Sequence, residues 1–522
     1  MWEIMRRIGI EEKTVRIIGS LYENPMDVFY MGDIEVKEVR SKRGLRQGCT
    51  LSPLLFSLYM EEFTRRMKAT KIGIKIGEET LTLLLFADDV ILLAEKPEDL
   101  QVLLNEVEKF SREVKIKFSG EKSKIMIINQ KEGERINYKW NLNNKEVELV
   151  KEYKYLGILV ENKGLEKEEN TLRMKAERQL GILKTNSTFR VNKYEVTRGI
   201  WKGVAVPTVL YGIEVLKAGA KECQGLETVQ NKAARLGLGA NKYAPSETLR
   251  GEMGWSSFEE RINKAKIKYF TTLRYMEENR WAKKIMNWKI ENSKILKDFR
   301  KRADKMKIHP NRREVNIQIN NEEDRNVVQR VQGEIKSEKK TMLEVEKKVR
   351  KVGLTKWKEK IENKPSLKLY TKKEMPRREE FYDGGWESKL LFKARSNSLE
   401  IGERKNRWTG EEEYCKGCLE YGDRITESIE HIIIECPRYF EEREKLIRNI
   451  EEEIGRSKWE EIKGEGKELE HLLGFAREGD GMTKLAKGYL GEIWRQRQME
   501  ERENPAERRN RIMEVGEEHN YT

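Results

Sequence analysis

The stretch Phe86-Ala87-Asp88-Asp89 lies between two short apolar runs, Leu81–Leu85 and Val90–Ala94. This pattern predicts two strands joined by a tight turn, because short apolar segments bounded by turn-forming residues are typical of hairpins. Adjacent carboxylates at a hairpin tip can project together and hold Mg²⁺ or Mn²⁺, which prefer oxygen ligands. Aspartate is also a common turn residue, so by itself the pair is better explained as an ordinary turn.

A glycine-punctuated segment, Arg43-Gly44-Leu45-Arg46-Gln47-Gly48-Cys49-Thr50-Leu51-Ser52-Pro53, precedes the turn. Its glycines permit a close approach of the backbone to a ligand, and its arginines can meet phosphates. Alone, this segment is better explained as a glycine-rich turn before a helix capped by Ser52, with Pro53 at the first helical position. Together, the segment and the carboxylate pair indicate nucleotidyl transfer.

The remaining apolar pattern predicts an α+β fold. A helix should follow Pro53, a second helix should begin at Pro97, and residues 125–128 should form a strand. This order suggests a split β-α-β sheet with helices on one face, and a further strand is expected before the first helix. Residues 136–160 contain a second hairpin candidate, and the pattern from about residue 165 to 288 is mostly helical.

The charge of the chain is unevenly spread over its 522 residues. The net charge is +14, and residues 281–380 alone, with 30 basic and 16 acidic side chains, account for all of it. A basic excess favours a polyanionic partner such as nucleic acid, although a solvated, lysine-rich protein would also show it. We expect four regions along the chain: an α+β region at 1–160, a helical region at 161–288, a basic charged linker at 289–380, and a mostly helical region at 381–522.

A second candidate site is the pattern Cys415-x₂-Cys418-x₁₂-His431-x₄-Cys436. Three cysteines and one histidine form a normal tetrahedral zinc set, although a chance cluster of small buried residues is the alternative. Five cysteines in a long chain without a secretory signal do not suggest a disulfide framework. We therefore expect a reducing compartment, the nucleus or the cytoplasm, and no apolar run is long enough to span a membrane.

At this point the sequence resembles the palm of reverse transcriptases, above all those of non-LTR (LINE-type) retrotransposons. Residues 43–53 look like motif B, Phe86-Ala87-Asp88-Asp89 looks like motif C, and Ser119-Gly120-Glu121-Lys122-Ser123 is similar to motif D. Tyr155-Leu156-Gly157 resembles the primer-grip hairpin. Many of these elements also carry a Cys-Cys-His-Cys motif downstream of the polymerase.

The resemblance implies an RNA-directed DNA polymerase with a partial palm, a helical thumb-like region and a zinc-binding C-terminal region. It implies Mg²⁺ (or Mn²⁺) held by Asp88 and Asp89, Lys122 as the group that assists the leaving pyrophosphate, and Zn²⁺ on the cysteines and histidine. The implied partners are an RNA template, a DNA primer or target, and deoxynucleoside triphosphates. Template or nucleotide contacts fall on five residues of motif B: Arg43, Gly44, Arg46, Gln47 and Gly48.

The sequence departs from the family in one respect. Motif A, with its Phe-Asp pair and the first metal-binding aspartate, should precede motif B, but only Asp27 and Asp33 lie upstream of Gln47 and neither follows a phenylalanine. We therefore expect an N-terminally truncated element. The alternative is a catalytically dead remnant that binds nucleic acid without adding nucleotides.

Overall fold

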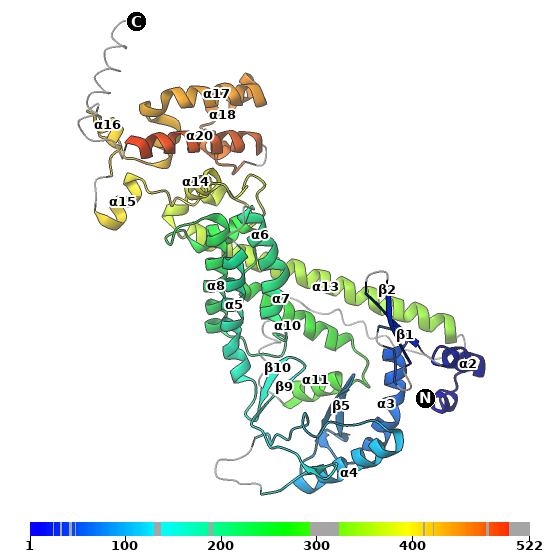
Figure 1. Ribbon diagram of the computed structural model, residues 1–522. Helices are drawn as coiled ribbons and strands as arrows, with labels where there is room; N and C mark the ends of the chain where they lie inside the picture. Colours follow the sequence, from blue (N-terminus) through cyan, green and yellow to red (C-terminus); the bar gives the residue numbers. More distant parts are fainter. Residues whose placement is uncertain are drawn as a thin grey trace. The chain divides into compact units, whose positions relative to one another are not determined.

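The computed structural model describes residues 1–23, 26–31, 34–40, 44–46, 48–129, 137–186, 192–292, 323–410, 413–420, 422–476 and 480–500. Within these residues the chain is mostly helical (Figure 1). It also contains five antiparallel two-stranded hairpins. The described residues of Met1–Leu165 and Glu277–Lys294 form one compact unit, which we call unit 1. Those of Glu166–Met276 and Ile295–Thr522 form the second, unit 2. No helix among the described residues is long and apolar enough to cross a membrane.

Unit 1 contains five helices and all five hairpins of the described chain. The helices are α1 (Trp2–Arg7), α2 (Glu12–Ser20), α3 (Ser52–Ala69), α4 (Pro97–Val114) and α11 (Trp281–Asn292). The hairpins are β1–β2 (Met26–Met31, Ile34–Arg40), β3–β4 (Ile74–Ile76, Glu79–Leu81), β5–β6 (Leu83–Phe86, Asp89–Leu92), β7–β8 (Asn141–Leu142, Lys145–Glu146) and β9–β10 (Glu152–Tyr155, Ile158–Glu161).

Helix α3 organises the core of unit 1 because it takes part in two hydrophobic clusters. Near its start, Leu55 packs with residues of α1 and α2. Further along, Met60, Phe63 and Met67 recur at helical spacing and pack against α4 and the β5–β6 hairpin. The Phe63 ring lies 5.1 Å from Phe110 of α4. The same helix therefore supports the glycine-rich segment before it and the hairpin after it.

The start of α3 differs slightly from the sequence prediction. Ser52 is the first helical residue and Pro53 the second, so Leu51 takes the capping position that we predicted for Ser52. The Ser52 hydroxyl donates instead to the carbonyl of Arg46 at 2.7 Å and lies 3.3 Å from the Tyr22 hydroxyl. The hydroxyl therefore holds the preceding loop in place and leaves the helix amides without a side-chain cap.

The predicted continuous palm sheet is not formed among the described residues, where each hairpin is a separate two-stranded sheet. The strand predicted at 125–128 is reduced to one isolated bridge, from Ile125 to Leu149. The amide of Ile125 donates to the Glu148 carbonyl, and its own carbonyl accepts from the Val150 amide. Because residues 148–150 occupy these backbone groups, they are not free to pair with the β5–β6 hairpin.

Unit 2 is mostly helical in its described part, with two isolated β-bridges, Met253 to Arg378 and Tyr414 to Thr426. Its α-helices are α5 (Glu166–Asn186), α6 (Lys193–Ile200), α7 (Val206–Leu210), α8 (Ala220–Leu238), α9 (Ser246–Met253), α10 (Phe258–Tyr275), α13 (Glu323–Glu362), α14 (Trp386–Arg395), α15 (Gly402–Thr409), α16 (Lys416–Glu420), α17 (Phe440–Ile454), α18 (Arg456–Gly464), α19 (Glu468–Leu472) and α20 (Asp480–Glu500). Shorter 3₁₀ or π turns are η1 (Trp201–Ala205), η2 (Pro365–Leu367), η3 (Leu369–Lys372), η4 (His431–Glu435) and η5 (Pro437–Tyr439). Helices α5 and α8 lie side by side, as do α17 and α20 (Figure 1).

Of residues 289–380, which we predicted to be a charged linker, the structure describes 289–292 and 323–380, and the described part includes a packed helix. Helix α13 is 40 residues long and lies against α10. Val345, Val349 and Trp357 on α13 are buried, as is Tyr370 beyond it. The sequence did not predict this packing, because the apolar residues of α13 are few and stand four or eight positions apart among many lysines and glutamates.

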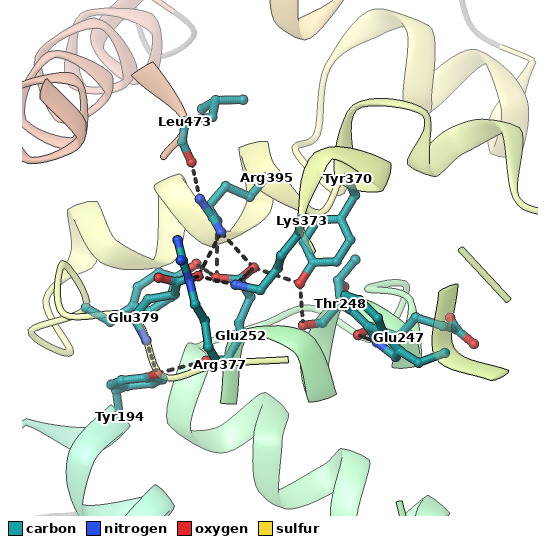
Figure 2. Close-up of polar contacts among 12 residues, drawn as sticks. Tyr194, Glu247, Thr248, Glu252, Tyr370, Lys373, Arg377, Glu379, Arg395 and Leu473 are labelled. Atoms are coloured by element: carbon teal, nitrogen blue, oxygen red, sulfur yellow. Dashed lines mark hydrogen bonds and ion pairs between the residues drawn. The ribbon is translucent and has the colours of Figure 1, made fainter. Parts of the chain in front are cut away.

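A buried network of charges joins three segments of unit 2 (Figure 2). Glu252 at the end of α9 accepts hydrogen bonds from Tyr370 at 2.7 Å, from Tyr382 at 2.8 Å and from Arg395 of α14 at 3.0 Å. Lys373 pairs with both Glu252 and Glu379. Two buried acids therefore face two buried bases, and the partly exposed Arg377 also pairs with Glu379 at 3.3 Å. Arg395 also donates to the Leu473 carbonyl and lies over the rings of Phe381 and Phe475.

Candidate active site and candidate metal centre

The carboxylate turn, which we define as Asp88 and Asp89, lies at the tip of the β5–β6 hairpin. Phe86 and Asp89 are the last paired residues, so Ala87 and Asp88 form a two-residue loop. Ala87 has a φ of +51°, and a positive φ at the first loop position is found in the primed turns that suit hairpin twist. The predicted strand-turn-strand arrangement is therefore confirmed.

Side chains alternate between the two faces of the β5–β6 hairpin, so one face packs against the core and the other is more exposed to solvent. Leu83 is buried, and Leu85, Val90 and Leu92 pack partly against the same cluster, so their face is the inner one. Because successive strand residues point to opposite faces, Phe86 and Asp89 share the outer face. Asp88 and Asp89 are both exposed. Exposed carboxylates side by side are a donor set that fits Mg²⁺, which keeps several of its waters when it binds.

The hairpin that resembles the primer grip lies close to this turn. Leu156 and Gly157 both have positive φ, 46° and 81°, as a two-residue type I′ turn requires, and Tyr155 pairs with Ile158 across it. Burial, together with the nearby Asp89 carboxylate, raises the pKa of the Tyr155 phenol. The effect of Asp89 on Tyr155 means that the two turns are within electrostatic reach of each other.

The loop with Lys122 is tied to the same hairpin. Its backbone forms a turn in which the Lys122 amide donates to the Ser119 hydroxyl at 3.3 Å, and the Ser123 amide to the Ser119 carbonyl at 3.0 Å. The Tyr153 hydroxyl of β9 donates to the Lys122 carbonyl at 3.4 Å. Tyr153 and Tyr155 are two residues apart and so share one face of the strand. The role of Tyr153 was not predicted, because nothing in the local pattern distinguishes it from the other tyrosine.

The glycine-rich segment is described only in part, and Arg43 and Gln47 lie outside the described residues. Gly44 and Gly48 have φ of +102° and +82°, a conformation that favours glycine. Among the described residues, no atom lies within 4 Å of the place where a Cβ would stand. Arg46 and Gly48 are exposed. The segment leads into α3, which packs against β5. The template or nucleotide contacts assigned to this segment remain predictions.

The four residues of the predicted zinc set lie together in unit 2. Cys415, Cys418, His431 and Cys436 are all buried, and their ligand atoms lie within 4.8 Å of one another. The Sγ atoms of Cys415 and Cys436 are 3.9 Å apart, and Cys418 Sγ is 3.4 Å from His431 Nε2. In a tetrahedral zinc site with ordinary bond lengths, these separations are ~3.8 Å and ~3.6 Å. The geometry therefore fits zinc.

Local backbone turns bring these ligands together. Cys415 donates its amide to the Ile425 carbonyl, and Cys418 follows within α16. His431 and Cys436 are linked by the π turn η4, in which the Cys436 amide donates to the His431 carbonyl at 2.7 Å. The π turn accommodates the four residues between these two ligands. The predicted zinc cluster is confirmed as an arrangement of side chains.

The cluster also has the electrostatics of a cation site. A hydrogen bond with Cys436 lowers the pKa of Cys415 to about 4, and the same contact raises the pKa of Cys436. Burial, followed by the charge of Cys415, raises the pKa of Cys418 to about 11. Three thiolates cannot share this space without a cation, so binding of zinc would release protons.

A carboxylate beside the histidine was not predicted. Glu435 lies one turn from His431, and its carboxylate is 3.4 Å from His431 Nδ1, although without hydrogen-bond geometry. Groups in this position orient a metal-binding imidazole and fix which nitrogen carries the proton. The spacing of four residues from the histidine is the one signal in the sequence that indicates such a carboxylate.

Comparison with known proteins agrees with this geometry. Residues 2–160 match the family described as reverse transcriptase (RNA-dependent DNA polymerase). The chain is 32% identical over 177 residues to the retrovirus-related Pol polyprotein from type-1 retrotransposable element R2 of Nasonia vitripennis, covering 31% of this chain and 16% of that polyprotein. The corresponding polyprotein of Popillia japonica is 37% identical over 102 residues, covering 19% and 14%.

A third relative comes from the type-2 retrotransposable element R2DM of Drosophila melanogaster, 28% identical over 165 residues and covering 30% of this chain and 16% of that polyprotein. The chain thus spans about one sixth of the length of the curated relatives that it matches. Residues 2–160 therefore carry a reverse transcriptase domain, and the chain is distantly similar to the Pol polyproteins of R2 retrotransposable elements.

Proposed function

We propose that this chain contributes the palm and a zinc-binding region to an RNA-directed DNA polymerase of an R2-like, non-LTR retrotransposon. The observation that supports this most is the carboxylate turn: two adjacent exposed aspartates at a tight hairpin, inside the segment that matches the reverse transcriptase family. Its partners would be an RNA template, a DNA primer or target, and deoxynucleoside triphosphates. Its compartment would be the nucleus or cytoplasm, where the zinc-binding thiols stay reduced.

In the proposed reaction, a primer 3′-hydroxyl attacks the α-phosphate of the incoming nucleotide, and pyrophosphate leaves. Asp88 and Asp89 would hold the metal, which when bound activates the hydroxyl and stabilises the leaving oxygen. The Lys122 ammonium would donate a proton to the pyrophosphate. Tyr155-Leu156-Gly157 would hold the primer end next to Asp89, and Gln47 with Gly48 would contact template or nucleotide.

Primer extension on an RNA template with Mg²⁺ tests the proposal. If the carboxylates of this chain suffice to hold the metal, the native chain should extend the primer. The Asp88→Asn variant should then lose extension by at least 100-fold, because one metal ligand loses its charge. The matched control is Glu78→Gln, which neutralises an exposed carboxylate at the neighbouring β3–β4 turn. Equal activity of the Asp88→Asn variant and the native chain would reject the assignment of the carboxylate turn.

The alternative proposal is a nucleic-acid-binding remnant. One observation supports it: the zinc cluster and the basic helix α13 belong to unit 2, whereas the carboxylate turn belongs to unit 1. Nucleic acid could therefore bind to unit 2 without a working palm. In addition, the third carboxylate that the family uses has not been assigned to a residue of this chain. Tight binding of a primer–template duplex with no extension under any metal would support this alternative.

A further inference from the structure

Contacts define which side of α13 faces the rest of unit 2. Val345 and Val349 form a buried cluster with Ile267 of α10. The Thr341 hydroxyl is 3.0 Å from the Tyr275 hydroxyl, and the Trp357 indole donates to the Glu247 carbonyl at 3.0 Å. These inner residues recur four apart along the helix, which keeps them on one side of it.

Four lysines lie on the opposite side of the helix. Lys340, Lys347, Lys351 and Lys358 are all exposed. Their separations of seven, four and seven residues are close to whole numbers of helical turns, so the four side chains follow one line along the helix. That line is ~27 Å long at a rise of 1.5 Å per residue. We call these four residues the lysine stripe.

Two other charged residues of α13 are paired within the protein. Glu346 pairs with Lys264 and Lys268 of α10, and Lys356 pairs with Glu259. By contrast, none of the four stripe lysines forms an ion pair with any residue that the structure describes. These two paired charges lie toward α10. The lysine stripe lies on the opposite side of the helix and is exposed.

We propose that the lysine stripe binds the phosphate backbone of a nucleic acid laid along α13. Lysine ammonium groups act as point charges that meet phosphates without reading bases, and each contact releases counterions. A straight run of four suits a polyanion of regular charge spacing better than a compact anion. This inference rests on the proposed function, because it names the surface through which the polymerase would hold its template–primer duplex outside the palm.

The test is the salt dependence of binding by the full chain to a 20-base-pair RNA–DNA duplex, measured by fluorescence anisotropy. The variant replaces Lys340, Lys347, Lys351 and Lys358 with Gln, which keeps helix propensity. We expect the slope of log affinity against log salt to become shallower by about 3.6 for a duplex, or about 2.8 if a single strand is bound. Between 50 and 200 mM salt, the native chain should lose on the order of 100-fold more affinity than the variant.

The control variant changes the same number of exposed lysines on other elements: Lys13, Lys71, Lys221 and Lys484 to Gln. It should keep most of the native slope, and circular dichroism should show that both variants are folded. A stripe variant with the slope of the control would overturn the inference and leave the polymerase proposal intact. Failure of the native chain to bind the duplex would overturn both. Loss of binding to phosphatidylserine vesicles, but not to the duplex, would assign the stripe to a membrane surface and overturn the inference.

Discussion

The carboxylate turn and the zinc cluster are both candidate metal sites, yet they are built in opposite ways. Asp88 and Asp89 are adjacent in sequence, exposed, and held by a hairpin with four-residue strands. The zinc set is buried and gathered from three turns spread over 22 residues. An exposed site can exchange its metal and admit substrate, whereas a buried one takes up its metal as part of folding. The exposed carboxylate turn therefore suits catalysis, and the buried zinc cluster suits a structural role.

If this contrast holds, loss of the zinc set should have the largest effect on stability. We expect Cys436→Ser to abolish binding of one zinc per chain and to unfold the surrounding part of unit 2, because structural zinc contributes on the order of 10 kcal/mol to folding. Elemental analysis and tryptophan fluorescence check this. Cys223→Ser is the control, since Cys223 lies outside the cluster. Full zinc content in the Cys436→Ser variant would contradict the assignment.

The buried charge network of unit 2 should rank second. Arg395→Met leaves Glu252 buried with part of its neutralising charge removed, which should cost about 3–5 kcal/mol of unfolding free energy. Adding Glu252→Gln should restore part of this loss. For comparison, Arg65→Met removes an exposed partner of Glu62 and should cost less than about 1 kcal/mol. Denaturant titration measures all three, and equal losses for Arg395→Met and Arg65→Met would mean that burial does not set the difference.

Acid should act through the same network. Burial acts to raise the pKa of Glu252, but Arg395 and Lys373 outweigh it and lower the pKa to about 2, below the ordinary value of 4.5. Since the folded pKa is the lower one, the stabilisation is complete above about pH 4.5 and is lost as pH falls toward 2. We expect a loss on the order of 3 kcal/mol over this window. Thermal melting of the native chain and of Glu252→Gln checks this, because the variant should show the flatter acid limb.

The smallest effect should come from the exposed turn. Ala87 has a φ of +51°, which suits glycine better than alanine. Ala87→Gly should therefore change the unfolding free energy by less than about 1 kcal/mol, because relief of backbone strain is offset by greater freedom of the unfolded chain. Ala87→Val should be distinctly worse, since a branched side chain disfavours positive φ. A large loss in Ala87→Gly would mean that the turn is not held as described.

The sequence predicted those parts of the molecule whose residues are close together along the chain. The β5–β6 and β9–β10 turns, the helices beginning near Ser52 and Pro97, and the zinc cluster all depend on local spacing. The buried network does not: Glu252, Lys373, Glu379 and Arg395 are scattered over almost 150 residues, and each belongs to a type that is usually exposed. The bridge between Ile125 and Leu149 takes the place of the strand that we predicted at 125–128. It is a long-range contact, so the local sequence pattern does not reveal it.

Because α3 takes part in two hydrophobic clusters, it links the unfolding of one part of unit 1 to that of another. Leu55 belongs to one hydrophobic cluster, and Phe63 and Met67 to another, on a single 18-residue helix. Loosening either cluster frees the helix and weakens the other, so the two should melt cooperatively. Amide hydrogens in the middle of α3 should then be among the slowest in unit 1 to exchange with solvent. While α3 stays folded, the loop before Ser52 should keep its position relative to the β5–β6 hairpin.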